Sequence, residues 1–423
     1  MGLYEELAWR GMIHDETEGV KDALAAGSVR AYIGFDPTAD SLHVGSLVQL
    51  VTLRRLQAHG HVPVALVGGA TGMIGDPSGK SKERNLLDDG ALARNVDGIR
   101  AQISRFLDFE GANAALLVNN LDWLGPLTMI DFLRDVGKHF TVNNMLAKES
   151  VRRRVQSEQG ISYTEFSYSI LQAVDFLELY DRHGVTLQCG GSDQWGNIVA
   201  GSDFVRAKRR KKVHGLTVPL IKSASGEKFG KTEAGTVWLD AARTSPYDFF
   251  QFWLRTDDRD VGSYLRYFSS RGEEEIGRIE AEHASDPSKR GAQRALAEEM
   301  TALVHGEDAL AQAVRTTAQL HGGGGALRVA DLADGVVDRD AAAFEGEGAG
   351  LLDELLGCGL VPSKKEARRS IEGGGIYVND EKVSDVQRRL RLDEASTDED
   401  GVRYFALRKG KKSRRVLRIT ESR

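Results

Sequence analysis

The feature that most constrains the fold is an apolar strand, a helix and a second apolar strand that follow one another near the N-terminus. The strand-like segments are 29–35, with the sequence VRAYIGF, and 62–67, with the sequence VPVALV. Between them, residues 46–59 carry leucines at helical spacing and precede Gly60, a residue type that commonly ends helices. Two strands joined through a helix pair in parallel, so the sequence predicts an α/β domain built on a parallel sheet. Similar apolar runs predict further strands at 115–118 and 185–188.

Length and composition exclude several classes of protein. With 423 residues, the chain has room for about three domains at roughly 150 residues each. Its two cysteines, Cys189 and Cys358, are too few and too far apart for a disulfide scaffold or a cysteine-based zinc site, and they suit a reducing compartment. No segment has the apolar run of a signal peptide or of a membrane span, so we expect a cytoplasmic protein with no membrane partner.

Charge is distributed unevenly along the chain. The whole chain carries a net charge of −6, whereas residues 351–423 hold 17 Lys and Arg against 13 Asp and Glu, a net of +4. The first 350 residues therefore carry −10. A basic end module on an acidic body predicts a C-terminus that binds nucleic acid.

Changes in composition divide the chain into four parts. We expect the α/β domain to occupy residues 1–243, a helical and highly charged domain to occupy 244–320, a linker to occupy 321–349 and a compact α+β module to occupy 350–423. The linker opens with the glycine run 322–325. A glycine-rich connection predicts few contacts between the C-terminal module and the rest of the chain.

The first motif that carries chemistry lies between the first strand and its helix. It contains Asp36 and Thr38, followed by His43 and Gly45. A strand–loop–helix junction directs backbone N–H groups toward an anion, His43 could donate to a phosphate oxygen, and the bare backbone of Gly45 could stack against a flat base. The alternative is a helix cap with an incidental histidine. For an isolated pattern of this kind, we favour that alternative.

The second motif is the segment GEKFGKT at 226–232. Its lysines Lys228 and Lys231 and the hydroxyl of Thr232 are separated by glycine, as in a mobile cationic loop that could clamp a triphosphate. A solvated turn is the alternative for any single pattern of this type. Because the two motifs occur in this order around an α/β domain, the combination is more specific than either motif alone.

These two motifs, together with longer segments of the sequence, resemble those of a known family. HVGS and KFGKT resemble the HIGH and KMSKS signatures of class I aminoacyl-tRNA synthetases, and longer segments resemble those of bacterial tyrosyl-tRNA synthetases. Those segments are YIGFDPTADSLHVG, LVGGATGMIGDPSGK, TEFSYSILQAVDF, QCGGSDQWGN and KFGKTEAGTVWLD. The resemblance implies a Rossmann-like catalytic domain, a helical domain that contacts tRNA and a small RNA-binding module similar to ribosomal protein S-four. It also implies a homodimer that uses ATP to join L-tyrosine to tRNA(Tyr).

Helical spacing supports an amino-acid site independently of the resemblance. Tyr168, Gln172 and Asp175 lie at positions i, i+4 and i+7 and therefore share one face of a helix. A phenol, an amide and a carboxylate on that face could receive an amino acid. A solvated polar face is the alternative, but the apolar Leu171 on the same side favours a lined pocket.

The resemblance assigns roles to individual residues. The substrate phenol would bind Tyr32 and Asp175, the substrate ammonium would bind Tyr168, Gln172 and Asp76, and Gln194 would lie near the carboxylate and the ribose, although a lone buried glutamine is more often structural. The phosphates would contact Thr38, His43, Lys228, Lys231 and Thr232. The full ATP site would comprise Gly34, Asp36, His43, Gly45, Ser46, Gly191, Asp193 and Lys231. Lys80 and Arg84 match mobile cations of the family, and ordinary surface charges are an equal alternative for them.

Two further points concern the nucleotide. We expect Mg²⁺ to accompany ATP, but the sequence contains no dedicated carboxylate cage for a metal. Ser46 occupies the last position of the first signature, where the family usually carries His or Asn. Because serine is shorter, its contact with the ATP ribose would be lost or bridged by water.

Two basic clusters are candidates for tRNA contacts. The first, Arg206, Lys208, Arg209 and Arg210, lies in VRAKRRKK and follows the GSDQWGN segment, where an acceptor stem would have to lie. The second, Lys364, Lys365, Arg368 and Arg369, forms one face of a predicted helix that ends at the glycines 373–375. A solvated helix face is the alternative for both clusters, and the positive charge of the C-terminal module favours RNA for the second.

Two other functions remain open on sequence grounds. A tryptophanyl-tRNA synthetase shares the fold but has no need for Tyr32 and Asp175 to face a phenol. A catalytically silent RNA-binding relative of the synthetases is the other alternative. The intact His43, Gly45 and Lys231 argue against it.

Overall fold

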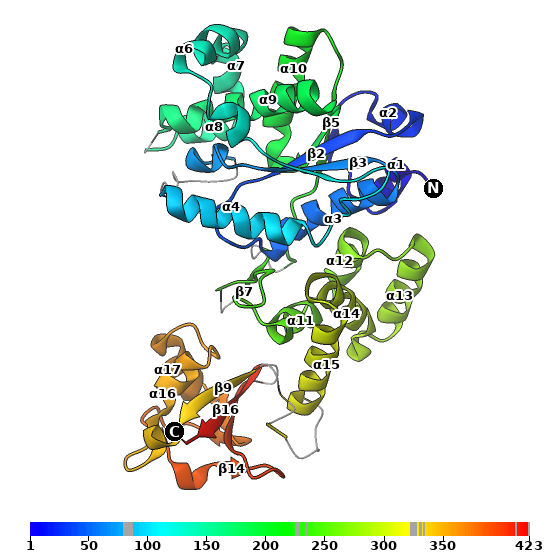
Figure 1. Ribbon diagram of the computed structural model, residues 1–423. Helices are drawn as coiled ribbons and strands as arrows, with labels where there is room; N and C mark the ends of the chain where they lie inside the picture. The colour runs from blue at the N-terminus through cyan, green and yellow to red at the C-terminus, as the bar shows by residue number, and fades with distance from the viewer. Residues whose placement is uncertain are drawn as a thin grey trace. The chain divides into compact units, whose positions relative to one another are not determined.

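The computed structural model describes residues 1–78, 88–158, 160–224, 229–232, 235–321, 328–329, 332, 335–410 and 413–421. Two compact units make up the chain. The N-terminal unit comprises Met1–Ser223 and Gly262–Arg278, and the C-terminal unit comprises Ala224–Val261 and Ile279–Arg423. Figure 1 shows the helices and strands of each unit.

A six-stranded sheet forms the centre of the N-terminal unit. Its strands, in spatial order, are β1 (Asp15–Glu16), β6 (His214–Val218), β5 (Leu187–Gly191), β2 (Arg30–Phe35), β3 (Val62–Val67) and β4 (Leu116–Asn119). Neighbouring strands pair in parallel, apart from β1, which is antiparallel to β6. The predicted parallel sheet is confirmed, and the four strands predicted from apolar runs correspond to β2, β3, β4 and β5.

Helices cover both faces of this sheet. Figure 1 shows α3 (Val44–Ala58) and α4 (Asp89–Ile103) on one face and α9 (Tyr163–His183) and α10 (Trp195–Arg209) on the other. Shorter helices of the unit are α1 (Leu3–Trp9), α2 (Val20–Ala26), α5 (Leu121–Leu124), α6 (Met129–Asp131), α7 (Val142–Ala147) and α8 (Glu149–Val155). Two more helices, α12 (Val261–Phe268) and α13 (Glu273–Ser285), contain residues of both units.

The local sequence sets both ends of α9, which carries several of the predicted site residues. The Ser162 hydroxyl caps the first turn by accepting a hydrogen bond from the Glu165 N–H at 3.2 Å. Gly184 ends the helix with a φ of 65°, a left-handed conformation that glycine adopts at little cost. Phe176 is fully buried and its ring packs against that of Tyr32 on β2, with 5.3 Å between the ring centroids. Helix α9 is therefore fixed in length and held against the sheet.

The order of the strands reverses at β2. The next strand in sequence, β3, lies on one side of β2, whereas β5 lies on the other. In an open parallel sheet, such a reversal leaves a crevice at the carboxyl ends of the two strands that flank it. The residues that follow β2 and β5 are therefore the ones the fold presents to a ligand.

Three helices form a compact bundle in the C-terminal unit, here called the helical part. They are α11 (Pro246–Leu254), α14 (Gly291–His305) and α15 (Glu307–His321). Helix α11 begins where the Ser245 hydroxyl accepts a hydrogen bond from the Asp248 N–H at 3.1 Å, and Pro246 occupies its first turn. Trp253 and Leu296 are fully buried within the bundle. Before α11, β7 (Lys231–Thr232) and β8 (Gly235–Thr236) form a short antiparallel hairpin.

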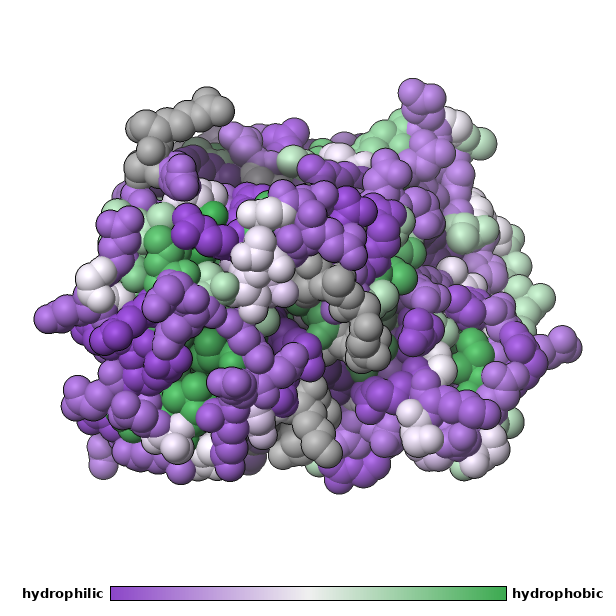
Figure 2. All heavy atoms as spheres, turned by 90° about the horizontal axis from the view of Figure 1, so that it is seen from below, coloured by the Kyte–Doolittle hydropathy of each residue, from purple (hydrophilic) through white to green (hydrophobic). Residues whose placement is uncertain are grey.

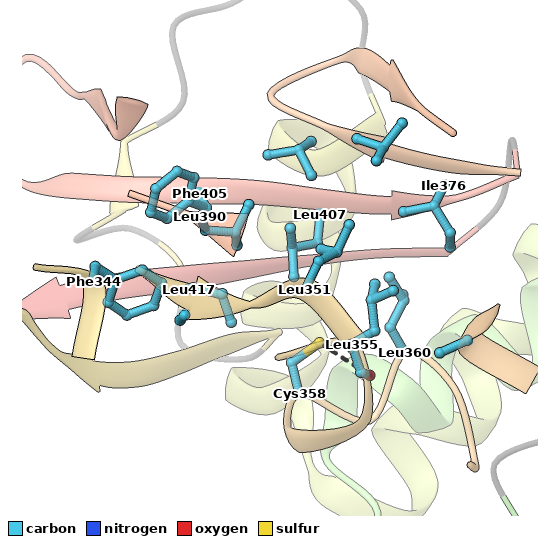
Figure 3. Packing of buried hydrophobic residues seen from close by; sticks show 14 of the residues in the cluster. Phe344, Leu351, Leu355, Cys358, Leu360, Ile376, Leu390, Phe405, Leu407 and Leu417 are labelled. Atoms are coloured by element: carbon cyan, nitrogen blue, oxygen red, sulfur yellow. Dashed lines mark hydrogen bonds between the residues drawn. The ribbon is translucent and has the colours of Figure 1, made fainter. Parts of the chain in front are cut away.

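The rest of the C-terminal unit, residues 336–421, is here called the C-terminal domain. Its main sheet has the order β12 (Glu381–Val383), β11 (Ile376–Val378), β15 (Arg403–Lys409), β16 (Ser413–Thr420) and β9 (Val336–Asp340), with β14 (Ser396–Thr397) beside β15. The other elements are β10 (Ala349–Gly350), β13 (Arg389–Leu390), α16 (Leu351–Gly357) and α17 (Lys364–Glu372). Figure 3 shows its core, in which the rings of Phe344 and Phe405 stack with 5.4 Å between their centroids.

The structure differs from the predicted linker at 321–349 in two respects. First, β9 pairs in parallel with β16 and Phe344 is 1% exposed, so residues 336–349 belong to the C-terminal domain. Second, an apolar cluster joins this domain to the helical part, with Tyr247 and Leu320 packed against Val416 of β16. The expectation of few contacts across the glycine-rich connection is therefore wrong, because composition does not reveal apolar side chains that meet across long sequence separations.

Polar side chains dominate the surface seen in Figure 2, where apolar residues form separate patches. Charged residues make up 28% of the sequence, which accounts for this appearance. Across the part of the chain that the structure describes, every helix is too short or too polar to span a bilayer.

Candidate active site

A pocket occupies the crevice at the carboxyl ends of β2 and β5. Its volume is about 180 Å³, and its walls come from β2, β5, α3, α9 and the segments that follow the strands. The predicted site residues that line it are Tyr32, Gly34, Asp36, Ser46, Asp76, Tyr168, Gln172, Asp175, Asp193 and Gln194. The fold thus brings together residues that are far apart in the sequence, and it places Tyr168, Gln172 and Asp175 on one face of α9 as their spacing predicts.

Four other predicted residues, Thr38, His43, Gly45 and Gly191, are described by the structure but are not among those that line the pocket. Each lies within two residues of one that does. His43 immediately precedes α3, and a Cβ atom on Gly45 would lie 2.7 Å from Cε1 of the His43 ring. The missing side chain of Gly45 therefore leaves the space that the imidazole occupies.

The deep end of the pocket holds a hydroxyl and a carboxylate. The Tyr32 side chain is 1% exposed, and its hydroxyl has no hydrogen-bond partner among the described residues. Asp175 is 2% exposed, and it accepts hydrogen bonds from Trp123 Nε1 at 2.8 Å and from Asn120 Nδ2 at 3.1 Å. Burial raises the pKa of Asp175 to about 7, although these two donors oppose the shift. A ligand hydroxyl at this end would meet an unused donor and acceptor.

Burial and then the charge of Asp175 raise the pKa of the Tyr32 hydroxyl well above its ordinary value of 10. Tyr32 is therefore a neutral phenol at physiological pH and can both donate and accept a hydrogen bond. The effect of Asp175 on this pKa also shows that the two groups lie within electrostatic reach of each other.

Further carboxylates surround the other end of the pocket. The Tyr168 hydroxyl donates to Asp36 Oδ2 at 3.1 Å, and Gln194 Nε2 donates to Asp76 Oδ2 at 2.7 Å. Gln172 Oε1 accepts a hydrogen bond from Asn197 Nδ2 at 3.2 Å. These bonds orient the acceptor oxygens around the cavity, and their accumulated negative charge favours a cationic group.

Some residues of this network were not predicted from the sequence. Asn120 and Trp123 hold Asp175, the Thr71 hydroxyl donates to Asp36 Oδ1 at 3.2 Å, and Asn197 bridges Gln172 and Gln194. A signal for Asn120 was available, because it lies two residues after the predicted strand 115–118 of the parallel sheet. Cys189 also lines the pocket, and burial raises the pKa of its thiol to about 12, so the thiol is neutral.

The predicted cationic loop is only partly within the described residues. Lys228 lies outside them, as do Lys80 and Arg84. Lys231 and Thr232 form β7, and their roles stay predictions. Phe229 is 9% exposed, with its ring centroid 5.7 Å from that of Phe252 and 5.9 Å from that of Trp253. No local sequence pattern predicts this aromatic contact, which attaches Phe229 to α11.

The first predicted tRNA cluster lies at the C-terminal end of α10. Arg206 pairs with Asp203 at 2.5 Å, Lys208 Nζ donates to the Asp135 carbonyl at 3.3 Å, and Arg209 makes two bonds to Asp181, at 2.7 and 2.6 Å. Arg210 ends the helix in a left-handed conformation with a φ of 56°. Arg206, Lys208 and Arg209 are thus already engaged within the chain, and Arg210 is exposed.

The second predicted tRNA cluster lies on α17, as the sequence predicts. Lys364, Lys365, Arg368 and Arg369 are exposed. Ala367 and Ile371 are fully buried and attach the helix to the core of the C-terminal domain. Lys364 pairs with Asp353, and Arg369 pairs with Glu366 at 2.7 Å. The helix therefore presents a basic face to solvent, and its contact with RNA stays a prediction.

No group of three or more His, Cys, Asp or Glu side chains within the described ranges has the geometry to hold a metal ion. The pocket carboxylates are instead tied to protein donors, as set out for Asp36, Asp76 and Asp175. The Tyr32 hydroxyl at the deep end of the pocket, and Asp36 and Asp76 at the other end, suit an organic ligand with a hydroxyl at one end and a cation at the other.

Comparison with known proteins identifies two matching families. Residues 25–322 match the family described as tRNA synthetases class I (W and Y), and residues 331–416 match the tyrosine–tRNA ligase SYY-like C-terminal domain. The tyrosine–tRNA ligase of Roseiflexus castenholzii is 50% identical over 99% of this chain and 99% of its own length. That of Bacillus caldotenax is 51% identical over 99% of this chain and 100% of its own length.

A solved structure agrees with these matches. A C-terminally truncated mitochondrial tyrosyl-tRNA synthetase from Aspergillus nidulans has a TM-score of 0.69 and 30% identity, and the match covers 75% of this chain and 94% of that one. The tryptophanyl alternative is not favoured, because these relatives and the C-terminal family all carry the tyrosine name. Similarity over nearly the full length, in both parts of the chain, shows that this protein belongs to the bacterial-type tyrosyl-tRNA synthetases, a family of class I aminoacyl-tRNA synthetases.

Proposed function

We propose that the pocket of the N-terminal unit is where this chain activates L-tyrosine with ATP. The chain is a class I aminoacyl-tRNA synthetase, and its reaction is the formation of tyrosyl-adenylate and transfer of the tyrosyl group to the 3′ end of tRNA(Tyr). Pyrophosphate and AMP are released. One observation carries the assignment of the site: the buried end of the pocket holds the Asp175 carboxylate and the Tyr32 hydroxyl, which has no hydrogen-bond partner among the residues that the structure describes.

In this proposal the substrate phenol occupies the deep end of the pocket. Its O–H donates to Asp175, and its oxygen accepts from the Tyr32 hydroxyl. The substrate ammonium lies at the other end, where Tyr168, Gln172 and Asp76 receive it, and Gln194 lies near its carboxylate. A buried polar group that finds no partner is costly, so phenylalanine would leave the Tyr32 hydroxyl unpaired and would offer Asp175 no hydroxyl donor.

The chemistry needs positioning more than proton transfer. A carboxylate oxygen of tyrosine attacks the α-phosphorus of ATP, and the bond from that phosphorus to the pyrophosphate oxygen breaks. Negative charge builds on the phosphate oxygens, so cations and N–H groups provide the stabilisation. We assign this role to Thr38, His43, Lys80, Arg84, Lys228, Lys231 and Thr232, with Mg²⁺ arriving together with ATP.

The remainder of the ATP site comes from β2 and the residue after it, the N-terminus of α3 and the end of β5. Gly34, Asp36, Gly45, Ser46, Gly191 and Asp193 complete it. Ser46 lines the pocket, and in this proposal it takes the position beside the ribose. The bare backbone of Gly34, which lines the pocket, allows the flat nucleotide to approach closely.

A direct experiment tests this function. We expect the purified chain to catalyse ATP–pyrophosphate exchange that depends on L-tyrosine, and to charge tRNA(Tyr) in the same preparation. Exchange should be weak with phenylalanine and with tryptophan at equal concentration. Exchange that depends on tryptophan, or tRNA binding without exchange with any of the three amino acids, would refute the proposal.

Lys231 offers a test of the cationic loop. Lys231→Ala is expected to lower the rate of pyrophosphate exchange by about a hundredfold, because one preorganised donor to a charged transition state contributes on this scale. Tyrosine binding, measured by equilibrium dialysis, should stay nearly unchanged. Lys222→Ala, which removes a lysine upstream of the loop, is the matched control and should leave exchange intact. An equal loss of tyrosine affinity in Lys231→Ala would assign the loop a different role.

We also propose that tRNA binds the basic face of α17 together with Arg206, Lys208, Arg209 and Arg210 of α10. In this division, residues 1–243 catalyse, residues 244–320 contact tRNA as a helical domain, and the C-terminal domain adds phosphate contacts. The four cations of α17 are exposed, which supports the proposal that α17 binds tRNA.

We propose further that the enzyme is a cytoplasmic homodimer. Large apolar side chains between residues 129 and 163 are exposed, including Met129 at 70%, Ile130 at 66%, Val142 at 59% and Tyr163 at 68%. Exposed apolar side chains concentrated in one region favour burial against another protein surface, and a second copy of this chain satisfies that need. Sedimentation as a single species of 46.3 kDa, the mass of one chain, would contradict it.

A further inference from the structure

A contact within the C-terminal unit joins the first turn of α11 to strand β16. Arg415 Nη2 lies 2.6 Å from Asp248 Oδ1, although the two residues are 167 positions apart. The Arg415 guanidinium also lies 5.9 Å from the centroid of the Tyr247 ring. The Arg415 side chain is 16% exposed and that of Asp248 is 39% exposed, so the pair is partly shielded from water. A shielded, hydrogen-bonded ion pair contributes more free energy to a contact than an exposed ion pair does.

An apolar cluster lies beside this ion pair. Tyr247 of α11 and Leu320 of α15 pack with Val416 of β16, together with Val329 and Leu332, and all five are at most 5% exposed. Leu417, the next residue of β16, belongs instead to the core of the C-terminal domain. Successive residues of a strand point to opposite faces, so Val416 faces the helical part whereas Leu417 faces the core of the C-terminal domain.

The local sequence aims Asp248 at its partner. The Ser245 hydroxyl accepts a hydrogen bond from the Asp248 N–H and donates to Asp248 Oδ2 at 3.2 Å. The other carboxylate oxygen, Oδ1, is the one that binds Arg415. The cap of α11 therefore fixes the carboxylate before Arg415 meets it, which lowers the conformational entropy lost in forming the pair.

We propose that Asp248 and Arg415 are positioning residues for tRNA charging: they hold the C-terminal domain on α11 so that the basic face of α17 has a fixed orientation when tRNA arrives. This inference rests on the proposed binding of tRNA to α17. A domain on a free tether loses orientational freedom when it binds, and docking in advance removes that cost from the binding step. The pair therefore acts on the affinity for tRNA and leaves tyrosine activation alone.

The test uses the full-length chain with Arg415→Met, Asp248→Asn and the double variant. Methionine keeps the apolar stem of the side chain, and asparagine keeps a hydrogen-bond acceptor for the Ser245 hydroxyl. Arg418→Met is the matched control, because Arg418 lies on the same strand but pairs with Asp338 of the same domain, at 2.5 Å. Three quantities are measured: pyrophosphate exchange, the KM for tRNA in charging, and hydrogen exchange of peptides from α11 and β16.

Arg415→Met and Asp248→Asn are each expected to raise the KM for tRNA about tenfold, a typical size for coupling between two sites, with kcat and pyrophosphate exchange unchanged. Hydrogen exchange should become faster in both peptides, because their shared surface opens. The double variant should be no worse than either single variant, since both remove the same interaction. Arg418→Met should change none of these quantities.

Three results would overturn the proposal. Unchanged hydrogen exchange would show that the pair does not hold the domain. Faster hydrogen exchange with an unchanged KM for tRNA would show that docking does not position it. A parallel fall in pyrophosphate exchange would place the pair in support of catalysis.

Failure of the proposed tRNA site gives a different pattern. The deciding variant replaces four lysines and arginines of α17 by glutamine: Lys364, Lys365, Arg368 and Arg369. If α17 does not bind tRNA, this variant keeps the KM for tRNA of the unchanged protein. That result would not depend on the hydrogen exchange measured for Arg415→Met. If α17 binds tRNA, this variant raises the KM while hydrogen exchange in α11 and β16 stays unchanged.

Discussion

Asp175→Asn is expected to lower kcat/KM for tyrosine activation by about tenfold to a hundredfold, the range for one hydrogen bond to a charged group. Activation of phenylalanine, which offers no hydroxyl to this carboxylate, should change little, so the preference for tyrosine narrows. Asparagine keeps the size of the side chain and an acceptor for Trp123 Nε1. Pyrophosphate exchange with each amino acid measures both effects. A folded variant with an unchanged preference would remove Asp175 from the phenol site.

Tyr32→Phe is the companion variant. Its hydroxyl has no partner among the described residues, so its removal should leave the free energy of unfolding unchanged or slightly higher. The preference for tyrosine over phenylalanine should still fall, because the substrate oxygen loses a donor. A loss of stability would show that the hydroxyl already has a structural partner in the free enzyme.

The protonation of Asp175 can be followed through its effect on stability. Burial raises the pKa of Asp175 from 3.8 to about 7 in the folded protein. The unfolded chain therefore releases this proton more readily, and the free energy of unfolding falls as the pH rises from about 4 to 7. Asparagine cannot ionise, so Asp175→Asn does not share this loss of stability. The melting temperature of Asp175→Asn minus that of the unchanged protein should therefore increase from pH 5 to pH 7. If this difference in melting temperature does not vary with pH, burial does not raise the pKa of the Asp175 carboxyl.

The parallel sheet and one wall of the pocket could be predicted because short-range periodicity determines them. The β2–α3–β3 unit follows from two apolar runs and the leucines between them. The shared face of Tyr168, Gln172 and Asp175 follows from helical spacing, and all three line the pocket. The identity of the substrate did not follow from spacing, and it entered through the resemblance of whole segments to a family.

The remaining features depend on contacts across long sequence separations. Asn120 and Trp123 reach Asp175 only because the sheet places the end of β4 near α9. Strand β9 carries the sequence VVDRD within a stretch rich in Asp, Ala and Gly, and it is a strand because β16 pairs with it about 80 residues later. No local pattern records such a partner, so the composition of 321–349 predicted a linker where half of the range is part of a domain.

Removal of residues 322–423 is expected to reduce tRNA charging by at least about a hundredfold while pyrophosphate exchange stays within about twofold of the full-length value. The pocket lies wholly in the N-terminal unit, so deletion takes no residue from its walls. The truncated chain loses the cations of α17, and each phosphate contact that is lost reduces both the affinity for tRNA and its dependence on salt. Exchange and charging are measured on the same truncated protein at two salt concentrations.

The position of the cut matters, because the C-terminal domain begins before residue 350. A chain that ends at residue 349 keeps β9 without β16 and Phe344 without Phe405, which leaves an unpaired strand and an exposed aromatic ring. We expect this chain to aggregate more and to melt at a lower temperature than the chain that ends at residue 321. Equal melting temperatures would show that residues 336–349 behave as a linker after all. Loss of both activities in the chain ending at 321 would show that the C-terminal domain supports the catalytic unit, and full charging by that chain would show that the basic face of α17 is only solvated.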